Sequence, residues 1–330
     1  MNRNIVTITL ICACLLAGSA RAEIDGRDVL KHMLEAEGKV CFIAHEVTTL
    51  ARGPAVTSEQ TVYRAGFRGM RMEYLDPPNM KGEIRADDGK VLAHYIPADK
   101  VLKLRPSRIA GMREWASHSP RFSKEQNLQV QLVGKDKIAG RDAYVVAIKP
   151  HFRKPGPTHK FWVDAGKWIK LKSEEIAPSG TVLSTSYFTK IDFVSSIPDE
   201  KFRIEAPPGV RIEREEEHSR HISIEEARRA AGFRILEPSY LPPGLKRAGA
   251  GVIPFRDGKI VVLRYTDGVN MLSLFQTTGD KLSPKFLEHL RHGPTRSGGE
   301  VYSWQVGKLN LTIVSRLPLD EVRRIAASVK

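Results

Sequence analysis

The sequence predicts a β-rich α+β protein, in which a curled antiparallel half-barrel with a covering helix is followed by a smaller α+β domain. Two observations predict the half-barrel: many short segments place an apolar residue at every second position, and Asp, Gly and Pro turns separate them. A third observation predicts the smaller domain, because helical and strand-like spacings alternate beyond residue 222.

The first residues have the features of a signal peptide. Arg3 provides a basic start, residues 5–17 are apolar but too few to span a bilayer, and Ala20-Arg21-Ala22 is a small-x-small cleavage site. We therefore expect export to the periplasm and cleavage after residue 22. The alternative, lipid attachment at Cys14, fits less well, because residues 11–13 match the lipoprotein pattern poorly.

Cleavage would leave Cys41 as the only cysteine, since Cys12 and Cys14 lie in the signal. One cysteine cannot form an internal disulfide, so apolar cores must stabilise the chain. Cys41 lies in the apolar stretch KVCFIAHEV, which favours a buried small side chain over a reactive thiol.

The chain is strongly basic, with a formal net charge of +14. For an exported protein this charge indicates acidic partners such as anionic lipid headgroups, the phosphates of lipopolysaccharide or an acidic segment of another envelope protein. Nucleic acid is excluded as a partner, because the charges are scattered and form no tract with stacking aromatic residues.

The half-barrel begins with a helix predicted at residues 28–36, where apolar residues have helical spacing. Beyond it the period changes to two. Strands are predicted at residues 61–68, 70–75, 82–86, 90–96, 101–104, 128–133, 144–149, 159–163, 168–175 and 181–193. Residues 107–122 interrupt this series and are predicted to form a short helix or lid.

A change of composition marks a boundary. Pro207-Pro208-Gly209 is followed by the charge run at residues 211–221, which is typical of an exposed linker. The predicted organisation is therefore a signal peptide at 1–22, the half-barrel at 23–206, a linker at 207–222 and a second domain at 223–330.

The second domain opens with a capping box at Ser223 and Glu226, and its first helix ends at Gly232. Strands follow at residues 259–265, 271–277, 300–305 and 310–315. Further helices are predicted from Ser283 onward and at residues 319–329.

No pattern of residues supports an enzyme or a metal site. His218 and His221, and likewise His289 and His292, have helical spacing but lack further ligands nearby. No nucleophile elbow, zinc-protease motif or glycine-rich phosphate loop is present in the sequence. We therefore expect a non-enzymatic protein without a cofactor.

Methionine and aromatic residues are frequent in the half-barrel. They either fill the core or line an apolar concavity beneath the lid, where flexible thioethers and flat rings suit acyl chains. The candidate lipid-binding residues are Met70, Met72, Tyr74, Tyr95, Met112, Trp115, Trp162 and Trp168. Trp162 and Trp168 flank a short turn, where an indole can bury apolar area while its N–H finds a partner at the edge.

Several stretches resemble a known family. RMEYLDPP, ADDGKVLAHYIPADKVLKL, IAGRDAYVVAIKP, HKFWVDAGKWIKLKSE and FTKIDFVSSIPDEKFRIEAPPGV resemble, in order, segments of the lipoprotein-carrier (LolA-like) fold. This resemblance covers nearly all of residues 25–210. YLPPGLK, RYTDGVNMLSLF and LTIVSRLPLDEVRRIAASVK resemble the carboxy-terminal domain of the MucB/RseB family, the periplasmic regulators of envelope-stress sigma factors.

The resemblance implies a negative regulator that binds the periplasmic segment of a membrane anti-sigma factor and shields it from proteolysis. Lipopolysaccharide or lipoprotein would release that partner. It implies that the LolA-like half-barrel senses lipid. It also implies that the second domain, together with its junction to the first, forms most of the contact with the partner. A homodimer is compatible with the family. The alternative is a LolA-like carrier of lipoproteins or lipids, which would not need a second domain.

Overall fold

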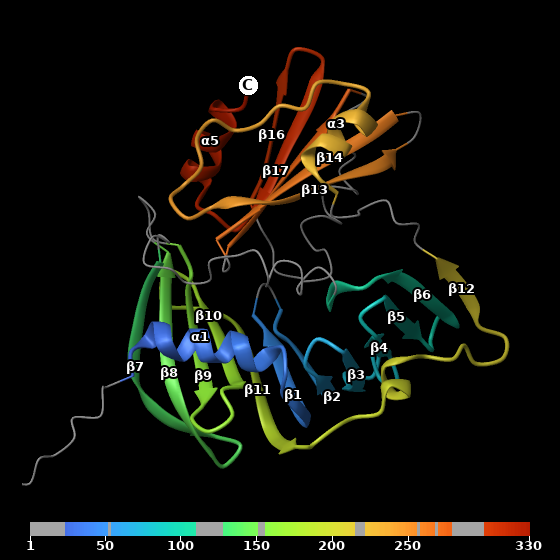
Figure 1. The fold of residues 1–330 in the computed structure, drawn as a ribbon, viewed down its shortest axis with the longest axis vertical. Coiled ribbons are helices and arrows are strands. Elements are labelled where there is room, and N and C mark those ends of the chain that lie inside the picture. The colour runs from blue at the N-terminus through green and yellow to red at the C-terminus, as the bar shows by residue number, and fades with distance from the viewer. Residues whose placement is uncertain are drawn as a thin grey trace, which may run out of the picture.

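The computed structural model of the protein describes residues 24–51, 54–109, 128–150, 156–214, 222–255, 258–267, 270–278 and 300–330. These residues form a 12-stranded sheet and a five-stranded sheet, which Figure 1 shows as two separate sheets, with the five-stranded one at the top. The predicted signal peptide, most of the predicted lid, the predicted helix from Ser283 and all four histidines of the two spaced pairs lie outside the described residues.

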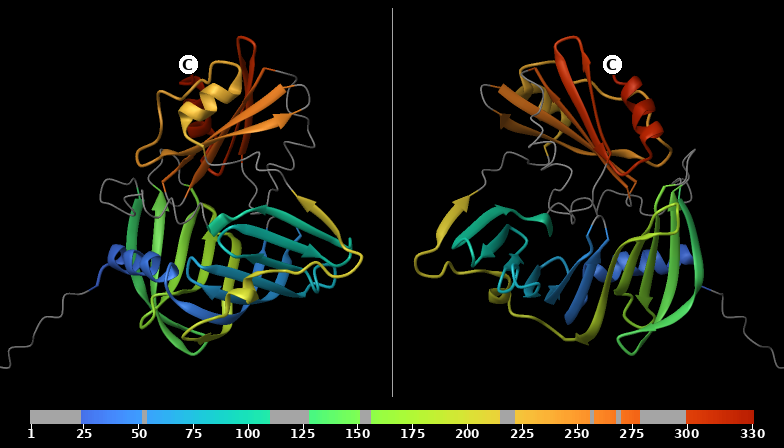
Figure 2. Two further views of the ribbon diagram at one scale, coloured as in Figure 1. Left: turned by 45° about the vertical axis from the view of Figure 1, so that its right-hand side comes forward. Right: turned by 180° about the vertical axis from the view of Figure 1, so that it is seen from behind.

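The large sheet has the strand order β12-β6-β5-β4-β3-β2-β1-β11-β10-β9-β8-β7. Its pairs are antiparallel except for β12 with β6. The strands are β1 (Cys41–Leu50), β2 (Val56–Ala65), β3 (Gly69–Asp76), β4 (Ile84–Asp87), β5 (Val91–Ile96), β6 (Val101–Pro106), β7 (Leu128–Ile138), β8 (Arg141–Pro150), β9 (Thr158–Asp164), β10 (Lys170–Ile176), β11 (Val182–Phe193) and β12 (Arg211–Arg214). The sheet is strongly curled (Figure 2), which confirms the predicted fold class.

Helix α1 (Gly26–Glu37) covers one face of this sheet beside β7 and β8 (Figure 1). The carboxylate of Asp25 caps its first turn by accepting hydrogen bonds from the backbone N–H groups of Arg27 and Asp28. Val29, Leu30 and Met33 are buried against strand residues from β7, β8 and β9. Their helical spacing is the periodicity from which the sequence predicted this helix.

A short 3₁₀ helix, η1 (Asp199–Phe202), packs against β3 and β4. Phe202 is buried with Ala65 and Ile197 in a small cluster, and Cys41 packs against that cluster as a partly buried thiol. Gly69 is needed here, since a Cβ at this position would lie 2.2 Å from Cγ of Phe202.

Strand β12 extends the edge of the large sheet. Its four residues pair in parallel with β6, so that Arg211 lies opposite Val101. These residues belong to the segment that the sequence predicted as an exposed linker. Most of them are exposed, and an exposed edge strand needs no buried apolar face.

The small sheet has the order β13-β14-β15-β17-β16. Its elements are α3 (Ile224–Ala231), β13 (Lys246–Phe255), β14 (Gly258–Thr266), β15 (Met271–Thr277), β16 (Glu300–Val306), β17 (Leu309–Ser315) and α5 (Leu319–Ala327). The predicted capping box of Ser223 and Glu226 is present, and Gly232 ends α3 in a left-handed conformation. Helices α3 and α5 share one apolar core with the sheet (Figure 2). Within the described ranges, no helix has the length and apolar character required to cross a membrane.

Candidate functional site

Strand pairing decides which candidate lipid-binding residues share a face of the large sheet, because residues directly opposite each other point to the same side. Met70, Met72 and Tyr74 alternate along β3 and lie opposite Arg64, Val62 and Gln60 of β2. The side chains of Met70, Met72 and Tyr74 therefore lie on one face of the sheet, as their spacing predicts. Tyr74 is buried, and Met72 packs against the apolar cluster that contains Phe42 and Val62.

Trp168 lies on the same face as this set, at the other end of the sheet. Its ring stacks on Tyr144 with centroids 5.7 Å apart and contacts His32 of α1 at 4.7 Å. The pairing of Tyr144 with Val163 and of Val146 with Phe161 places these rings on the side that α1 covers. Starting from Phe161, the directly opposite residue in each neighbouring strand can be followed across β10, β11, β1 and β2. All of these residues lie on one face of the sheet, which is also the face of Tyr74.

Tyr95 points to the other face of the sheet. Tyr95 lies opposite Ile84, which lies opposite Glu73, and Glu73 stands between Met72 and Tyr74 in the chain. The structure therefore separates Tyr95 from the other described candidates, whereas Trp162 belongs to the apolar cluster against which Met72 and Trp168 pack. Met112 and Trp115 lie outside the described residues.

Trp162 is 5% exposed and illustrates how a buried indole is satisfied. Its Nε1–H donates to Oδ2 of Asp136 at 2.8 Å, and the ammonium of Lys172 lies 4.3 Å from the ring centroid. Hydrogen bonds from the backbone of Lys137 and from this indole lower the pKa of Asp136. The N–H thus has the partner that the sequence led us to expect.

The two sheets are joined by a partly buried ion pair. Nη1 of Arg316, the residue directly after β17, donates to Oε2 of Glu175 in β10 at 3.2 Å. Glu175 is 5% exposed. No sequence pattern indicated these residues, because 141 positions separate them and only the packing of the two sheets makes them neighbours.

His159 completes this junction, since it lies directly opposite Glu175 in the pairing of β9 with β10. Burial lowers the pKa of His159; Glu175 and Asp267 act in the opposite direction, while Arg316 lowers it. Asp267 belongs to the turn between β14 and β15, where its carboxylate accepts hydrogen bonds from the backbone and side chain of Asn270. We call His159, Glu175, Asp267 and Arg316 the junction cluster. Because positively and negatively charged groups lie together in this largely buried cluster, the interactions within it depend on the protonation state of His159.

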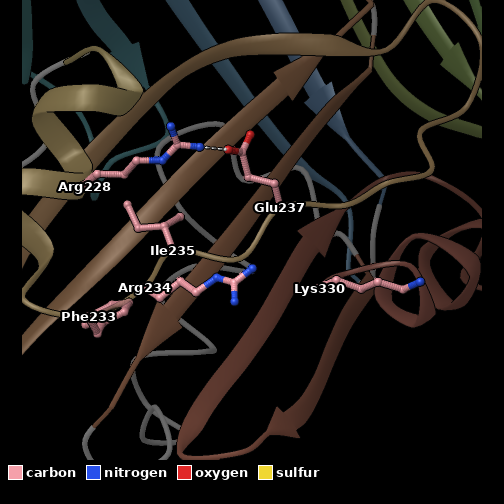
Figure 3. A pocket seen from close by; sticks show the side chains of 6 residues that line it. All are labelled: Arg228, Phe233, Arg234, Ile235, Glu237 and Lys330. Carbon is pink, nitrogen blue, oxygen red and sulfur yellow. Dashed lines mark hydrogen bonds and ion pairs between the residues drawn. The ribbon is translucent and has the colours of Figure 1, made fainter.

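A surface pocket of about 480 Å³ lies on the second unit, between α3 and the chain end. Its lining residues are Arg228, Phe233, Arg234, Ile235, Glu237 and Lys330. In Figure 3, Arg228 and Glu237 point toward each other, and they form an ion pair of 2.6 Å. Glu237 also pairs with Arg247, so its charge is already balanced.

The segment beneath this pocket is held by one side-chain amide. Gln276 accepts a hydrogen bond from the backbone N–H of Leu236 at 2.9 Å and donates to its carbonyl at 2.8 Å. In the described part of the chain, no group of three or more His, Cys, Asp or Glu residues could hold a metal ion.

Residues 27–206 match the model of the MucB/RseB N-terminal domain family. Over 345 aligned residues the chain is 21% identical to the sigma factor AlgU regulatory protein MucB of Pseudomonas aeruginosa, and the alignment covers 98% of this chain and 96% of that protein.

Solved structures with a similar fold include the MucA/MucB complex of Pseudomonas aeruginosa, with a TM-score of 0.61 and 18% identity, covering 92% of this chain and 98% of that chain. Another is MucB in complex with MucA(peri), with a TM-score of 0.60 and 17% identity over 93% of this chain and 98% of that chain. MucB alone gives a TM-score of 0.52 at 16% identity, covering 92% of this chain and 97% of that chain. The similarity therefore extends over both sheets.

Proposed function

We propose that this chain, which belongs to the MucB/RseB family, is a periplasmic, non-enzymatic negative regulator of an envelope-stress sigma factor. It acts by binding the periplasmic segment of a membrane anti-sigma factor. The observation that carries this proposal is the likeness over both sheets to MucB bound to MucA, at 92% coverage of this chain. A lipid carrier of the half-barrel type alone would not need the second sheet.

The bound segment is shielded from proteolysis until a lipid or lipoprotein signal releases it. Two features support this finer proposal. The face of the large sheet that carries α1 also carries Met70, Met72 and Trp168, which are partly exposed and offer apolar and aromatic surface to an acyl chain. The junction cluster joins the two sheets through Arg316 and Glu175, so a ligand that alters their packing also alters any partner that contacts both.

The anti-sigma factor and the lipid then favour different arrangements of the two sheets. Each ligand weakens the other by the same coupling free energy, because binding linkage is reciprocal. We assign the change of arrangement to the charged segment at residues 211–221, which the sequence predicts to be part of an exposed linker.

The test begins with the tagged full-length protein in its own cells. Brief crosslinking, purification and mass spectrometry should identify one single-span membrane protein with a periplasmic segment. That segment is then produced alone. Its binding to the mature protein, and its lifetime in the presence of a protease that cleaves it, are measured with and without lipid. Lipid should shorten the lifetime only when the regulator is present.

Two results would refute the proposal. Recovery of many unrelated triacylated lipoproteins, with no single-span partner, would establish the carrier alternative. Binding of the segment without any protection from the protease would reject the shielding step while retaining the interaction.

A further inference from the structure

One basic side chain of the small sheet, Arg264 of β14, points away from the helices. Its chain neighbours Leu263 and Tyr265 are buried in the core that α3 and α5 share with the sheet. Because successive side chains of a strand point to opposite faces, Arg264 lies on the other face. On that face, Val262 of the same strand is buried in a separate apolar cluster with Phe275. A cation therefore lies next to an apolar cluster.

The register of the small sheet gives the neighbours of Arg264, because directly opposite residues share a face. The row through Arg264 crosses all five strands, and its other members are Gly249, Ser273, Val314 and Val301. The next row contains Gly251, Val262, Phe275, Thr312 and Ser303. Neither row has an acidic residue, so these two rows provide no carboxylate to the guanidinium.

The guanidinium of Arg264 is unpaired in the part of the chain that the structure describes. Its Nη1 atom is buried and has no hydrogen-bond partner. Burial lowers the pKa of Arg264, and no carboxylate of the described residues acts on that pKa in the opposite direction. Buried charges in proteins are normally paired, because a charge loses its hydration on burial and only a partner offsets that loss. An added anion would supply the missing partner.

Asp267 is the acidic residue in the hairpin of β14 and β15, but it does not compensate Arg264. Its carboxylate accepts hydrogen bonds from the backbone N–H and the side-chain amide of Asn270. Asp267 also raises the pKa of His159 in the junction cluster, whereas the pKa of Arg264 shows no effect of it. The charge of Asp267 therefore acts within the turn and toward the large sheet.

The face around Arg264 is exposed on the side of the turn between β14 and β15. Arg264, Ser273 and Val314 are partly exposed, and Met271, which lies two residues before Ser273 in β15, is 59% exposed. A ligand that approaches here meets a guanidinium, a hydroxyl group and a flexible apolar side chain. The guanidinium suits a carboxylate, because it donates two parallel hydrogen bonds.

These neighbours favour a peptide segment with an acidic side chain as the ligand. A small anion would use the guanidinium but gain nothing from Met271, whereas a peptide can place a carboxylate on Arg264 and an apolar side chain on Met271. The net charge of +14 also favours an acidic segment. Since the turn of this hairpin contributes Asp267 to the junction cluster, a partner that spans the junction also reaches the hairpin.

We propose that the guanidinium of Arg264 binds a side-chain carboxylate of the anti-sigma segment, with an apolar residue of that segment on Met271. This inference rests on the proposed function, because it names a contact through which the small sheet binds its partner. It also gives a reason for an unpaired cation in the free protein: the partner supplies the carboxylate that the sheet lacks.

The experiment compares Arg264→Met with the wild type in the full mature protein. Methionine keeps an unbranched side chain but removes the guanidinium. The control is Arg323→Met, which changes an exposed arginine of α5, the helix that packs on the other face of the sheet. Arg264→Lys keeps the charge but cannot donate two parallel hydrogen bonds. Each protein is unfolded in urea and tested for binding of the periplasmic segment that the crosslinking identifies.

Two effects of opposite sign are expected from Arg264→Met. The urea midpoint of the small sheet should rise, because the variant removes an unpaired charge from a largely buried site. Binding of the segment should weaken at least about tenfold, since a hydrogen bond between charged groups is lost. Arg264→Lys should bind with an intermediate affinity. The control should leave the midpoint unchanged and the affinity within about twofold, because exposed charges act weakly.

A second series of variants identifies the carboxylate of the partner. Each Asp and Glu of the segment is replaced in turn by Asn or Gln, and its binding is measured with the wild type and with Arg264→Met. One replacement should weaken binding to the wild type about tenfold and should have almost no further effect on binding to Arg264→Met, because the two groups act as a pair.

A lower urea midpoint for Arg264→Met, or a failure of this variant to fold, would overturn the proposal by showing that the guanidinium stabilises the free protein. Additive effects of Arg264→Met with every acidic replacement would overturn it as well. Equal binding of the segment to the wild type and to Arg264→Met rejects this inference and leaves the proposed function in place. A segment that binds neither the wild type nor the control rejects the proposed function and this inference together.

Discussion

The ion pair between Glu175 and Arg316 should stabilise whichever of the two sheets unfolds first. The sheets have separate apolar cores, so urea should unfold them in separate transitions. When the first sheet unfolds, every contact between the two sheets is lost. The sheet that unfolds second therefore has no contacts with the other sheet during its own transition. A pair at the junction therefore contributes to the first transition only.

The size of the effect follows from the geometry. Nη1 of Arg316 and Oε2 of Glu175 are 3.2 Å apart, and the two side chains are 30% and 6% exposed. A hydrogen bond between charged groups stabilises by roughly 1.5–3 kcal/mol. Because Arg316 keeps part of its hydration, we expect a coupling of about 1–2 kcal/mol from the double-mutant cycle of Glu175→Gln and Arg316→Gln.

The assay is urea unfolding of the wild type, both single variants and the double variant, followed by tryptophan fluorescence and circular dichroism. Arg68 and Asp199 form a matched control pair at 2.6 Å, with side chains 52% and 66% exposed. Their cycle should give a coupling of about 0–1 kcal/mol, as exposed pairs do. The reasoning would be refuted if the effects of Glu175→Gln and Arg316→Gln on the first transition were additive. It would also be refuted if the coupling energy were the same in the first and second transitions.

Three other outcomes are expected. Burial depresses the pKa of His159 in the folded protein, so the junction should be most stable above the unfolded pKa of about 6.5 and should weaken as the pH falls below it; Arg316→Gln should raise the His159 pKa in an NMR titration. Gly69→Ala should destabilise by about 1–3 kcal/mol through overlap with Phe202, and Phe202→Leu in the same chain should restore part of the melting temperature. Gly232→Ala should cost about 1 kcal/mol in urea unfolding, because φ is +76° there.

Much of the fold could be predicted because local patterns agree with it. The helix at residues 28–36, the capping box at Ser223 and the turns after β3 and β4 are all encoded by neighbouring residues. Three strands escaped prediction, and one of them, β12, lies in the segment that was predicted as a linker. β1 carries Thr, His and Glu side chains among its apolar ones, and β13 contains glycines and a proline, which an edge strand tolerates.

The site was less predictable, because the face on which a residue lies depends on pairing between strands. Tyr74 and Tyr95 have similar local sequences, yet the register places them on opposite faces. Bulges in the pairing of β1 with β11 and of β9 with β10 add further shifts.

Among the described residues, two attachments of the second sheet to the first lie many strands apart in the order of the large sheet. The chain leaves the large sheet at β12, whereas the ion pair of Arg316 engages β10, and seven strands lie between these two in the sheet order. Eight interstrand steps of about 4.8 Å give a path of about 38 Å along the sheet. If the ionic attachment breaks, the covalent one remains, so the small sheet rotates about one edge of the large sheet. A partner bound across both would lose its contacts over β10 and β11 first and those near β6 last.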